Sequence, residues 1–123
     1  FNGYGISKQD TIEVSDNFKF SSYTSEGMWD DSNGDYGNEK CLGYVKQMNK
    51  KIELEVICEN INQDDKIFWN SRIRKSDKGA GIGQMKILNG TGKYKKLIGM
   101  VCPYGVNYKK HYGWLKAKCK IEN

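Results

Sequence analysis

Apolar and polar residues alternate along most of this chain, and turn residues interrupt the alternation at short intervals. A period of two is typical of strands that have one buried face. No segment shows a convincing helical period, and residues 1–10 look like an irregular lead-in. We therefore expect one all-β domain over residues 1–123, with seven or eight strands and turns near 31–35, 62–65, 76–79 and 89–92. The favoured fold is a small antiparallel up-and-down barrel, with a sandwich as the alternative.

Four cysteines form two pairs, and each pair brackets sixteen residues. A turn at residues 49 and 50 places Cys41 opposite Cys58, and the same construction places Cys102 opposite Cys119. Directly opposed residues of a hairpin lie at a Cα separation that suits a disulfide, so each segment is predicted to be a disulfide-stapled hairpin. In both registers the cysteines share a face with apolar residues, namely Val45, Leu54, Val56, Tyr104, Val106, Leu115 and Ala117.

The two predicted bridges indicate where the protein works. Disulfides persist in oxidising compartments, so we expect a secreted or periplasmic protein. The chain begins at Phe1 rather than Met, as expected after removal of a signal peptide or in a trimmed chain. No apolar run approaches the length of a transmembrane helix, so no membrane span is expected. Burial on the hairpin faces should protect both disulfides from mild reductants.

Charge is divided unevenly along the chain. Residues 1–65 carry 6 Lys/Arg and 13 Asp/Glu, a net charge of −7, whereas residues 66–123 carry 14 and 2, a net charge of +12. Such asymmetry suits an interaction or assembly module that meets a charged partner. The simpler interpretation is that a closed sheet brings the two halves together, so that their charges neutralise each other.

Glycines punctuate residues 81–99, where the sequence reads GIGQMKILNGTGKYKKLIG. This segment resembles the G-T-G-K-[FY]-x-x-[LA]-x-G stretch before the last hairpin of allene-oxide-cyclase-like and dirigent-like β-barrels. The resemblance implies a barrel that binds or processes hydrophobic or phenolic small molecules, and it identifies no catalytic residue. Physically, Gly90 and Gly92 are expected to adopt positive φ at a turn, and Gly99 to relieve a sharp bend. The segment GMW at 27–29 is similar to the G-x-W that opens lipocalin-type barrels, although such a tryptophan is also simply a core residue.

A barrel of this kind predicts a binding protein for a small apolar or aromatic molecule, without a cofactor. An eight-stranded barrel has an interior that side chains fill or that holds one small ligand. Aromatic side chains with a polar tip are typical walls of such a cavity. The residues expected near the cavity are Trp29, Trp69, Tyr104 and Trp114.

An enzyme of the same shape is the alternative, an isomerase or cyclase that uses a carboxylate and a tyrosine in the barrel mouth. Glu53 and Glu55 share a strand face, and Tyr44 is predicted to lie opposite Glu55. Paired carboxylates can perform acid–base chemistry. Glu53 is also predicted to face Lys46, which favours an outward polar face instead.

Oxygen-rich spacing at Asp31, Asn33 and Asp35 resembles a calcium loop. The position that requires glycine in an EF-hand is Tyr36, and the position of its bidentate glutamate is Leu42. A plain hairpin turn, opened by the Asn-Gly pair at 33–34, is therefore favoured over a metal site.

Three other patterns also have simpler interpretations. His111, the lone histidine, falls at the predicted tip of the last hairpin, where a zinc site or a catalytic triad is not favoured. Asn89 opens an Asn-Gly-Thr sequon that is otherwise only a turn. An aromatic and cationic strand face could stack nucleic acid bases, but a solvated surface is favoured; its residues are Phe68, Asn70, Arg72 and Arg74.

Overall fold

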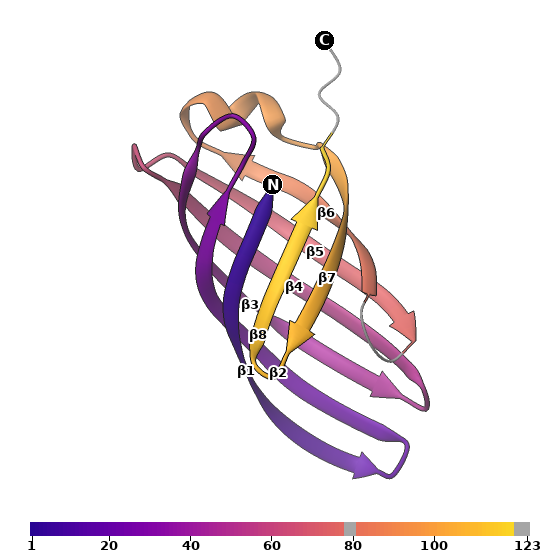
Figure 1. The fold of residues 1–123 in the computed structure, drawn as a ribbon. Coiled ribbons are helices and arrows are strands. Elements are labelled where there is room, and N and C mark those ends of the chain that lie inside the picture. The colour runs from indigo at the N-terminus through magenta and orange to yellow at the C-terminus, as the bar shows by residue number, and fades with distance from the viewer. Residues whose placement is uncertain (78–80, 120–123) are drawn as a thin grey trace.

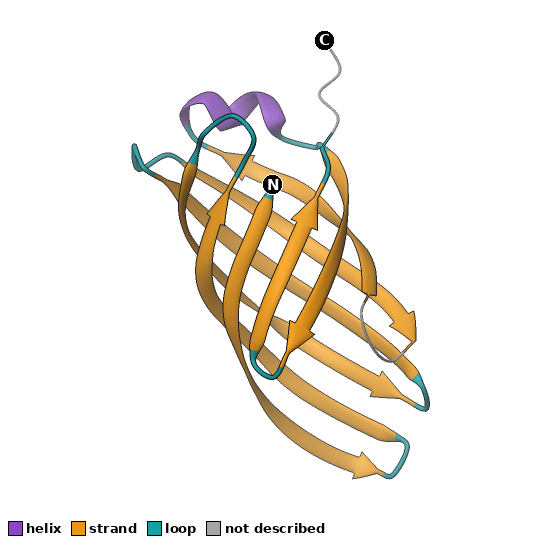
Figure 2. Ribbon diagram, in the orientation of Figure 1, coloured by secondary structure: helices purple, strands orange, loops and turns teal. Residues whose placement is uncertain are grey.

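The structure, a computed structural model, describes residues 1–77 and 81–119 and forms a closed antiparallel β-barrel (Figure 1). Neighbours in the chain are neighbours in the sheet, and the last strand pairs with the first to close the barrel. A short 3₁₀ helix, η1 (Gly92–Leu97), connects two of the strands (Figure 2). The strands are β1 (Asn2–Ser15), β2 (Phe18–Asp30), β3 (Tyr36–Met48), β4 (Lys51–Asn62), β5 (Ile67–Asp77), β6 (Gly81–Gly90), β7 (Val101–Lys109) and β8 (Tyr112–Ala117). The predicted all-β barrel is confirmed.

Both hairpin registers are confirmed by the strand pairing. Cys41 pairs with Cys58 across β3 and β4, with Cα atoms 4.1 Å apart, and the two residues form a disulfide. Cys102 and Cys119 form the second disulfide, with Cα atoms 4.6 Å apart. The bridges differ in exposure, because Cys119 is exposed to solvent whereas the other three cysteines are buried. The expectation that burial shields both bonds is therefore wrong for the second one.

The predicted irregular lead-in at residues 1–10 is wrong, since β1 begins at Asn2. This segment pairs with β2 along its length and with β8 over Asn2 to Ile6, and so it closes the barrel. Its inward positions are Gly3, Gly5 and Ser7, which are too small to produce a strong hydrophobic alternation. Strand propensity depends on packing context, and here the two neighbouring strands determine the conformation.

The glycine-rich segment forms a turn and η1 before β7 begins. Gly92 and Gly99 adopt positive φ, at 54° and 90°, as expected for Gly92. Gly90 does not have positive φ; a Cβ placed there would lie 2.7 Å from the carbonyl oxygen of Tyr94, so the residue permits close packing instead. Thr91 anchors the turn, because its hydroxyl accepts a hydrogen bond from the Ile67 amide at 2.9 Å.

The face of β5 that was expected to be solvated points into the barrel. A four-residue turn at 62–65 would place Cys58 opposite Trp69. In the structure Ile61 pairs with Ile67, so five residues separate the last paired positions, and Cys58 pairs with Asn70 instead. A shift of one residue moves every side chain of a strand to the other face. The side chains that are buried as a result are Phe68, Asn70, Arg72 and Arg74. The interpretation of this face as a solvated or base-stacking surface is therefore wrong.

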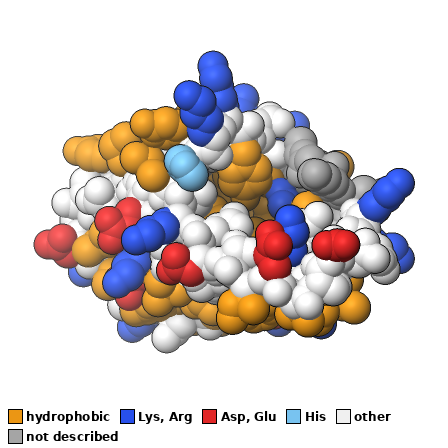
Figure 3. Space-filling view, turned by 90° about the horizontal axis from the view of Figure 1, so that it is seen from below, with side chains coloured by type: hydrophobic (Ala, Val, Ile, Leu, Met, Phe, Trp, Pro, Cys, Tyr) orange, Lys and Arg blue, Asp and Glu red, His pale blue; other side chains and the backbone are white. Residues whose placement is uncertain are grey.

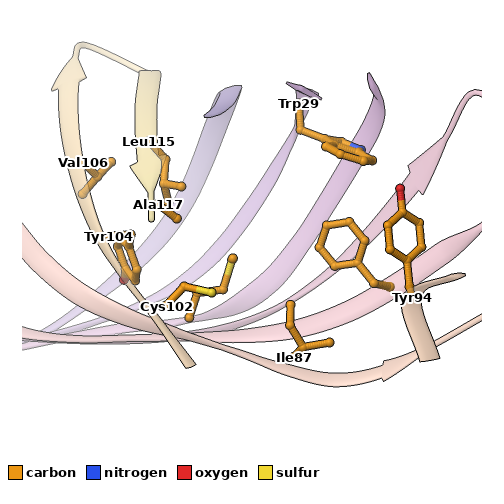
Figure 4. Close-up of a cluster of buried hydrophobic side chains, with 10 residues drawn as sticks. Trp29, Ile87, Tyr94, Cys102, Tyr104, Val106, Leu115 and Ala117 are labelled. Atoms are coloured by element: carbon orange, nitrogen blue, oxygen red, sulfur yellow. The ribbon is translucent and has the colours of Figure 1, made fainter. Parts of the chain in front are cut away.

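The apolar interior consists of two clusters. The larger lies near η1, where Trp29 packs edge-on against Phe68 with ring centroids 5.3 Å apart, and Phe68 packs against Tyr94 at 5.0 Å. Figure 4 shows Tyr94 and Trp29 on one side of this cluster and Tyr104 with Val106 on the other. The smaller cluster surrounds the first disulfide and comprises Tyr23, Cys41, Leu54, Val56 and Cys58.

The strands are staggered, so the two ends of the barrel differ. We call the end with the N-terminus and η1 the upper end, and the end with the tips of the β1–β2, β3–β4 and β7–β8 hairpins the lower end (Figure 1). β8 pairs with β1 as far as Ile6, and the Ser7 amide donates to the His111 carbonyl. Beyond that point β1 continues to Ser15 with β2 on one edge and no strand of the described residues on the other. The wall of the barrel is thus incomplete at the lower end.

The chain order also arranges the charge. The acidic strands β1–β4 form one side of the wall and the basic strands β5–β8 the other, so the halves meet at the β4–β5 and β8–β1 pairings. Within the described residues, two of the three ion pairs join the halves, Arg72 with Glu39 and Lys93 with Asp35. The closed sheet therefore brings the opposite charges of the two halves together.

Candidate functional site

A ring of four buried polar side chains crosses the barrel interior. The amide of Asn60 donates to Glu39 at 2.9 Å, and the amide of Asn70 donates to Asn60 at 2.9 Å. The Nε–H of Arg72 donates to Asn70 at 3.0 Å, and its Nη2 forms an ion pair with Glu39 that closes the ring. Each member has a partner of opposite charge or complementary hydrogen bonding, as buried polar groups require. The ring thus gives Arg72 a counter-charge and a hydrogen-bond acceptor inside the barrel.

Below this ring the barrel holds a cavity of about 50 Å³. Glu39 and Arg72 contribute to its wall, together with three tyrosines, Tyr23, Tyr104 and Tyr108. A fourth tyrosine, the partly exposed Tyr4, also contributes to the wall. The remaining wall is small or apolar and consists of Gly3, Gly5, Ser25, Cys41, Leu54, Val56, Val106, Gly113 and Leu115. A cavity of this size holds a few water molecules or one small chemical group, since a single water needs roughly 10–15 Å³. Drug-sized ligands occupy pockets of roughly 300–1,000 Å³.

The hydroxyls of Tyr23 and Tyr104 remain protonated at neutral pH. Burial raises the pKa of Tyr104 to about 12, and the charges of Arg74 and Arg72 only partly oppose this effect. Burial also raises the pKa of Tyr23, and the neighbouring Tyr108 adds to the shift. These hydroxyls can donate and accept hydrogen bonds, but they are poor candidates for phenolate bases.

Arg74 lies two residues after Arg72 on the same inward face of β5, and it is 5 % exposed. Its cross-strand neighbours are Leu54 on β4 and Gly83 on β6, so neither offers a side-chain acceptor. Its Nε and Nη1 atoms are buried and have no hydrogen-bond partner among the described residues. The guanidinium carbon lies 5.6 Å from the ring centroid of Tyr108, which lines the cavity.

The four aromatic residues predicted near a cavity are not brought together. Tyr104 lines the cavity, whereas Trp29 does not; it is buried against Phe68, and its indole N–H donates to the Ile61 carbonyl at 3.0 Å. Trp69 lies on the outer face of β5, and its indole N–H donates to Glu59 at 3.0 Å. Trp114 is 44 % exposed on the outer face of β8. The interior residues that the sequence analysis missed are Tyr23, Tyr108, Arg72 and Arg74.

The candidate catalytic residues lie on the outer face of β3 and β4. Tyr44 pairs with Glu55 as predicted, and its hydroxyl donates to the carboxylate at 3.4 Å. Glu53 pairs with Lys46, also as predicted. Because Leu54 points inward between the two glutamates, neither carboxylate reaches the barrel interior. Burial and the nearby glutamates raise the pKa of Tyr44, which makes it a weaker proton donor.

The turn at 31–35 is a hairpin turn in which the Asp31 side chain binds the backbone. The Asp31 carboxylate accepts hydrogen bonds from the amides of Asn33 and Asp35, at 2.9 and 3.0 Å. No cluster of three or more His, Cys, Asp and Glu residues suited to a metal occurs in the described ranges. His111 is exposed at the tip of the β7–β8 hairpin. In the same ranges, no helix has the length and apolar character needed to cross a membrane.

A second polar cluster fastens η1 to the upper end. Asp35 accepts hydrogen bonds from Gln63 at 2.8 Å and Tyr94 at 2.8 Å, and it forms an ion pair with Lys93 at 2.6 Å. The hydrogen bonds from Gln63 and Lys93 lower the pKa of Asp35 to about 2. Asn62 donates to the Tyr94 hydroxyl at 3.0 Å. The members of this cluster satisfy one another, so it serves the structure.

Comparison of the chain with protein-family models, curated proteins and solved structures gave no match. A function is therefore proposed from the barrel interior itself.

Proposed function

We propose that this protein binds a small molecule with an aromatic or apolar part in the lower interior of the barrel. The observation that carries the proposal is the convergence of Tyr23, Tyr104 and Tyr108 on a cavity that also has apolar walls. Such a mixture of aromatic and aliphatic surface with a few polar groups is typical of ligand sites. The resemblance of residues 81–99 to allene-oxide-cyclase-like and dirigent-like barrels supports the same ligand class.

The size of the cavity restricts the mode of binding. About 50 Å³ accommodates one end of a ligand, and the remainder would extend toward the lower end. There the incomplete wall beside β1 leaves room, and Tyr108 is 40 % exposed. Figure 3 views the molecule from this end and shows charged side chains of both signs around a central area of hydrophobic and uncharged atoms. Access from the lower end is thus part of the proposal.

An exported location belongs to the same proposal. Two disulfides in a chain of this size favour an oxidising compartment, secreted or periplasmic. A ligand that reaches the protein there must be present outside the cytosol.

NMR titration with phenol, benzamide and benzoate tests the binding site. We expect the inner methyl groups of Leu54, Val56 and Val106 to shift, while the outer methyl groups of Ile57 and Ile73 remain unchanged. Ser25→Leu should abolish the shifts, because Ser25 lines the cavity and a larger side chain would fill it. Thr24→Leu is the matched control, since Thr24 is the exposed neighbour on the outer face. Shifts that survive in Ser25→Leu, or no shifts with any probe, would overturn the proposal.

A further inference from the structure

The two inward-facing arginines of β5 differ in how their charge is balanced. Arg72 has its counter-charge in Glu39, and both side chains are buried. Arg74 has no carboxylate partner among the described residues. Glu13, near the lower end of β1, already pairs with Lys19 at 3.6 Å, and its side chain lies largely in solvent. Among the described residues, the lower interior therefore contains one positive charge more than it contains negative charges.

An unbalanced buried cation is costly, and so are its unpaired donors. Nε carries one N–H and Nη1 carries two, so three of the five N–H groups of Arg74 have no acceptor among the described residues. Burying such donors without a partner costs more than a hydrogen bond gains, so native proteins rarely retain them without a purpose. The ring of Tyr108 offers a cation–π contact at 5.6 Å, which supplies neither a counter-charge nor an acceptor for the buried Nε and Nη1 groups.

We propose that Arg74 is the anchor for an anionic group of the ligand, and that the ligand is a small organic acid such as an aromatic carboxylate. The inference rests on the proposed function, because it names the class of molecule that the lower interior takes. The guanidinium would bind the carboxylate through its N–H groups, with the hydroxyls of Tyr104 and Tyr108 nearby as further hydrogen-bond donors. The aromatic part of the ligand would lie against the tyrosine rings and the apolar wall.

A purely structural role for Arg74 makes a different prediction about stability. A structural arginine stabilises the fold, so its replacement lowers the midpoint of thermal unfolding. An arginine kept for a ligand costs stability in the free protein, so an apolar replacement of similar length is neutral or stabilising. We expect Arg74→Met to unfold at the same or a higher temperature than the wild type in buffer free of organic anions. A lower midpoint would overturn the inference.

Binding of matched probes provides the second test. Benzoate and benzamide have the same shape and differ in charge, and acetate supplies the carboxylate alone. We expect the wild type to bind benzoate about tenfold more tightly than benzamide, or better, because a charge-assisted hydrogen bond is stronger than a neutral one. Arg74→Met should lose this preference while it still binds benzamide. Lys75→Met, which removes the same charge from the exposed outer face one residue away, should retain it.

The outcomes separate this inference from the proposed function. Equal affinity of the wild type for benzoate and benzamide would overturn the anion anchor and leave the binding site standing. Acetate binding that requires Arg74, without binding of either aromatic probe, would support the anchor and overturn the aromatic site. The absence of binding by all three probes would overturn both.

Discussion

Two arginines on one face of β5 show how neighbouring residues acquire different roles. Arg72 completes a ring of hydrogen bonds with Glu39, Asn60 and Asn70, and its charge is balanced by the Glu39 carboxylate. Arg74 sits two positions further along, between Leu54 and Gly83, and finds no acceptor there. The residue type is the same, and the environment decides whether the guanidinium has a counter-charge inside the barrel or keeps unpaired N–H groups.

The Glu39–Arg72 pair should be essential for stability because either charge alone would be stranded in the interior. We expect Glu39→Gln and Arg72→Met each to lower the free energy of unfolding by about 3–5 kcal/mol, as measured by urea denaturation. The double variant should cost less than the sum of the two, since it strands no charge. The exposed Glu13–Lys19 pair is the control, and Glu13→Gln should change stability by less than about 1 kcal/mol. Equal costs at Glu39 and Glu13 would contradict this account.

At the scale of the strands, the distance to the neighbouring strand determines which glycines can be replaced by a larger residue. A Cβ placed on Gly27 would lie 1.8 Å from the Tyr4 carbonyl oxygen, because β1 and β2 approach each other closely there. A Cβ on Gly105 of β7 would meet nothing within 4 Å. Both residues are half-buried strand glycines, so the contrast comes from the neighbouring strand.

Gly27→Ala should therefore separate β1 from β2, whereas Gly105→Ala should be tolerated. We expect a loss of about 1–3 kcal/mol in the free energy of unfolding for Gly27→Ala, the usual range for overpacking. Gly105→Ala should be neutral or slightly stabilising, because alanine restricts the unfolded chain more than glycine does. Urea denaturation of the two variants measures the difference. A Gly27→Ala protein as stable as Gly105→Ala would show that the strands can move apart without cost.

The two disulfides should respond differently to a reductant. The sulfurs of Cys41 and Cys58 are in residues that are almost fully buried, whereas Cys119 is exposed. Thiol–disulfide exchange requires access to a sulfur, so Cys102–Cys119 should open first under native conditions. Alkylation followed by peptide mapping would identify the cysteines released at each time. Release of Cys41 before Cys119 would show that local opening of β3–β4, rather than exposure, governs reduction.

At the scale of the whole molecule, the barrel combines a partly polar interior with apolar residues on its outer wall. Charged and amide side chains occupy the centre, while Ile57, Ile73 and Trp114 face outward. Buried tyrosines lie at both ends of the interior. Tyr94 belongs to η1 at the upper end, and Tyr23 and Tyr104 line the lower cavity. Burial couples their ionisation to unfolding, because the phenolate form is poorly solvated inside the barrel.

Alkaline pH should consequently destabilise the barrel. The pKa of Tyr104 is raised from 10.0 to about 12 in the folded protein, so its contribution to stability is complete below pH 10 and is lost as the pH rises toward 12. We expect the urea midpoint to fall over this interval. Tyr104→Phe should show a smaller fall, because it removes one of the groups responsible. Tyrosinate absorbance provides an independent check, since Tyr23, Tyr94 and Tyr104 should ionise above the ordinary pKa of tyrosine. Ionisation of all eight at one pH, without unfolding, would contradict this.

Much of the fold follows from patterns that are local in the sequence. The stapled hairpins were predicted with their registers, because the turn at residues 49 and 50 and the opposed cysteines define each pairing within a short segment. The Tyr44–Glu55 and Lys46–Glu53 pairs were predicted for the same reason. The first ten residues were missed, because their inward positions are small and their strand forms only between two neighbours.

The sequence by itself determined which residues share a face of each strand, since alternation is a local property of the extended chain. The tertiary structure alone decided which face of β5 points inward. One additional residue in the loop at 62–66 set the register, and barrel closure then placed Arg72 and Arg74 inside and Trp69 outside. The candidate site depends on this register and on barrel closure, because its tyrosines and Arg74 come from strands that meet only when the sheet closes. Alternation specifies two faces, and only long-range pairing specifies which of them is buried.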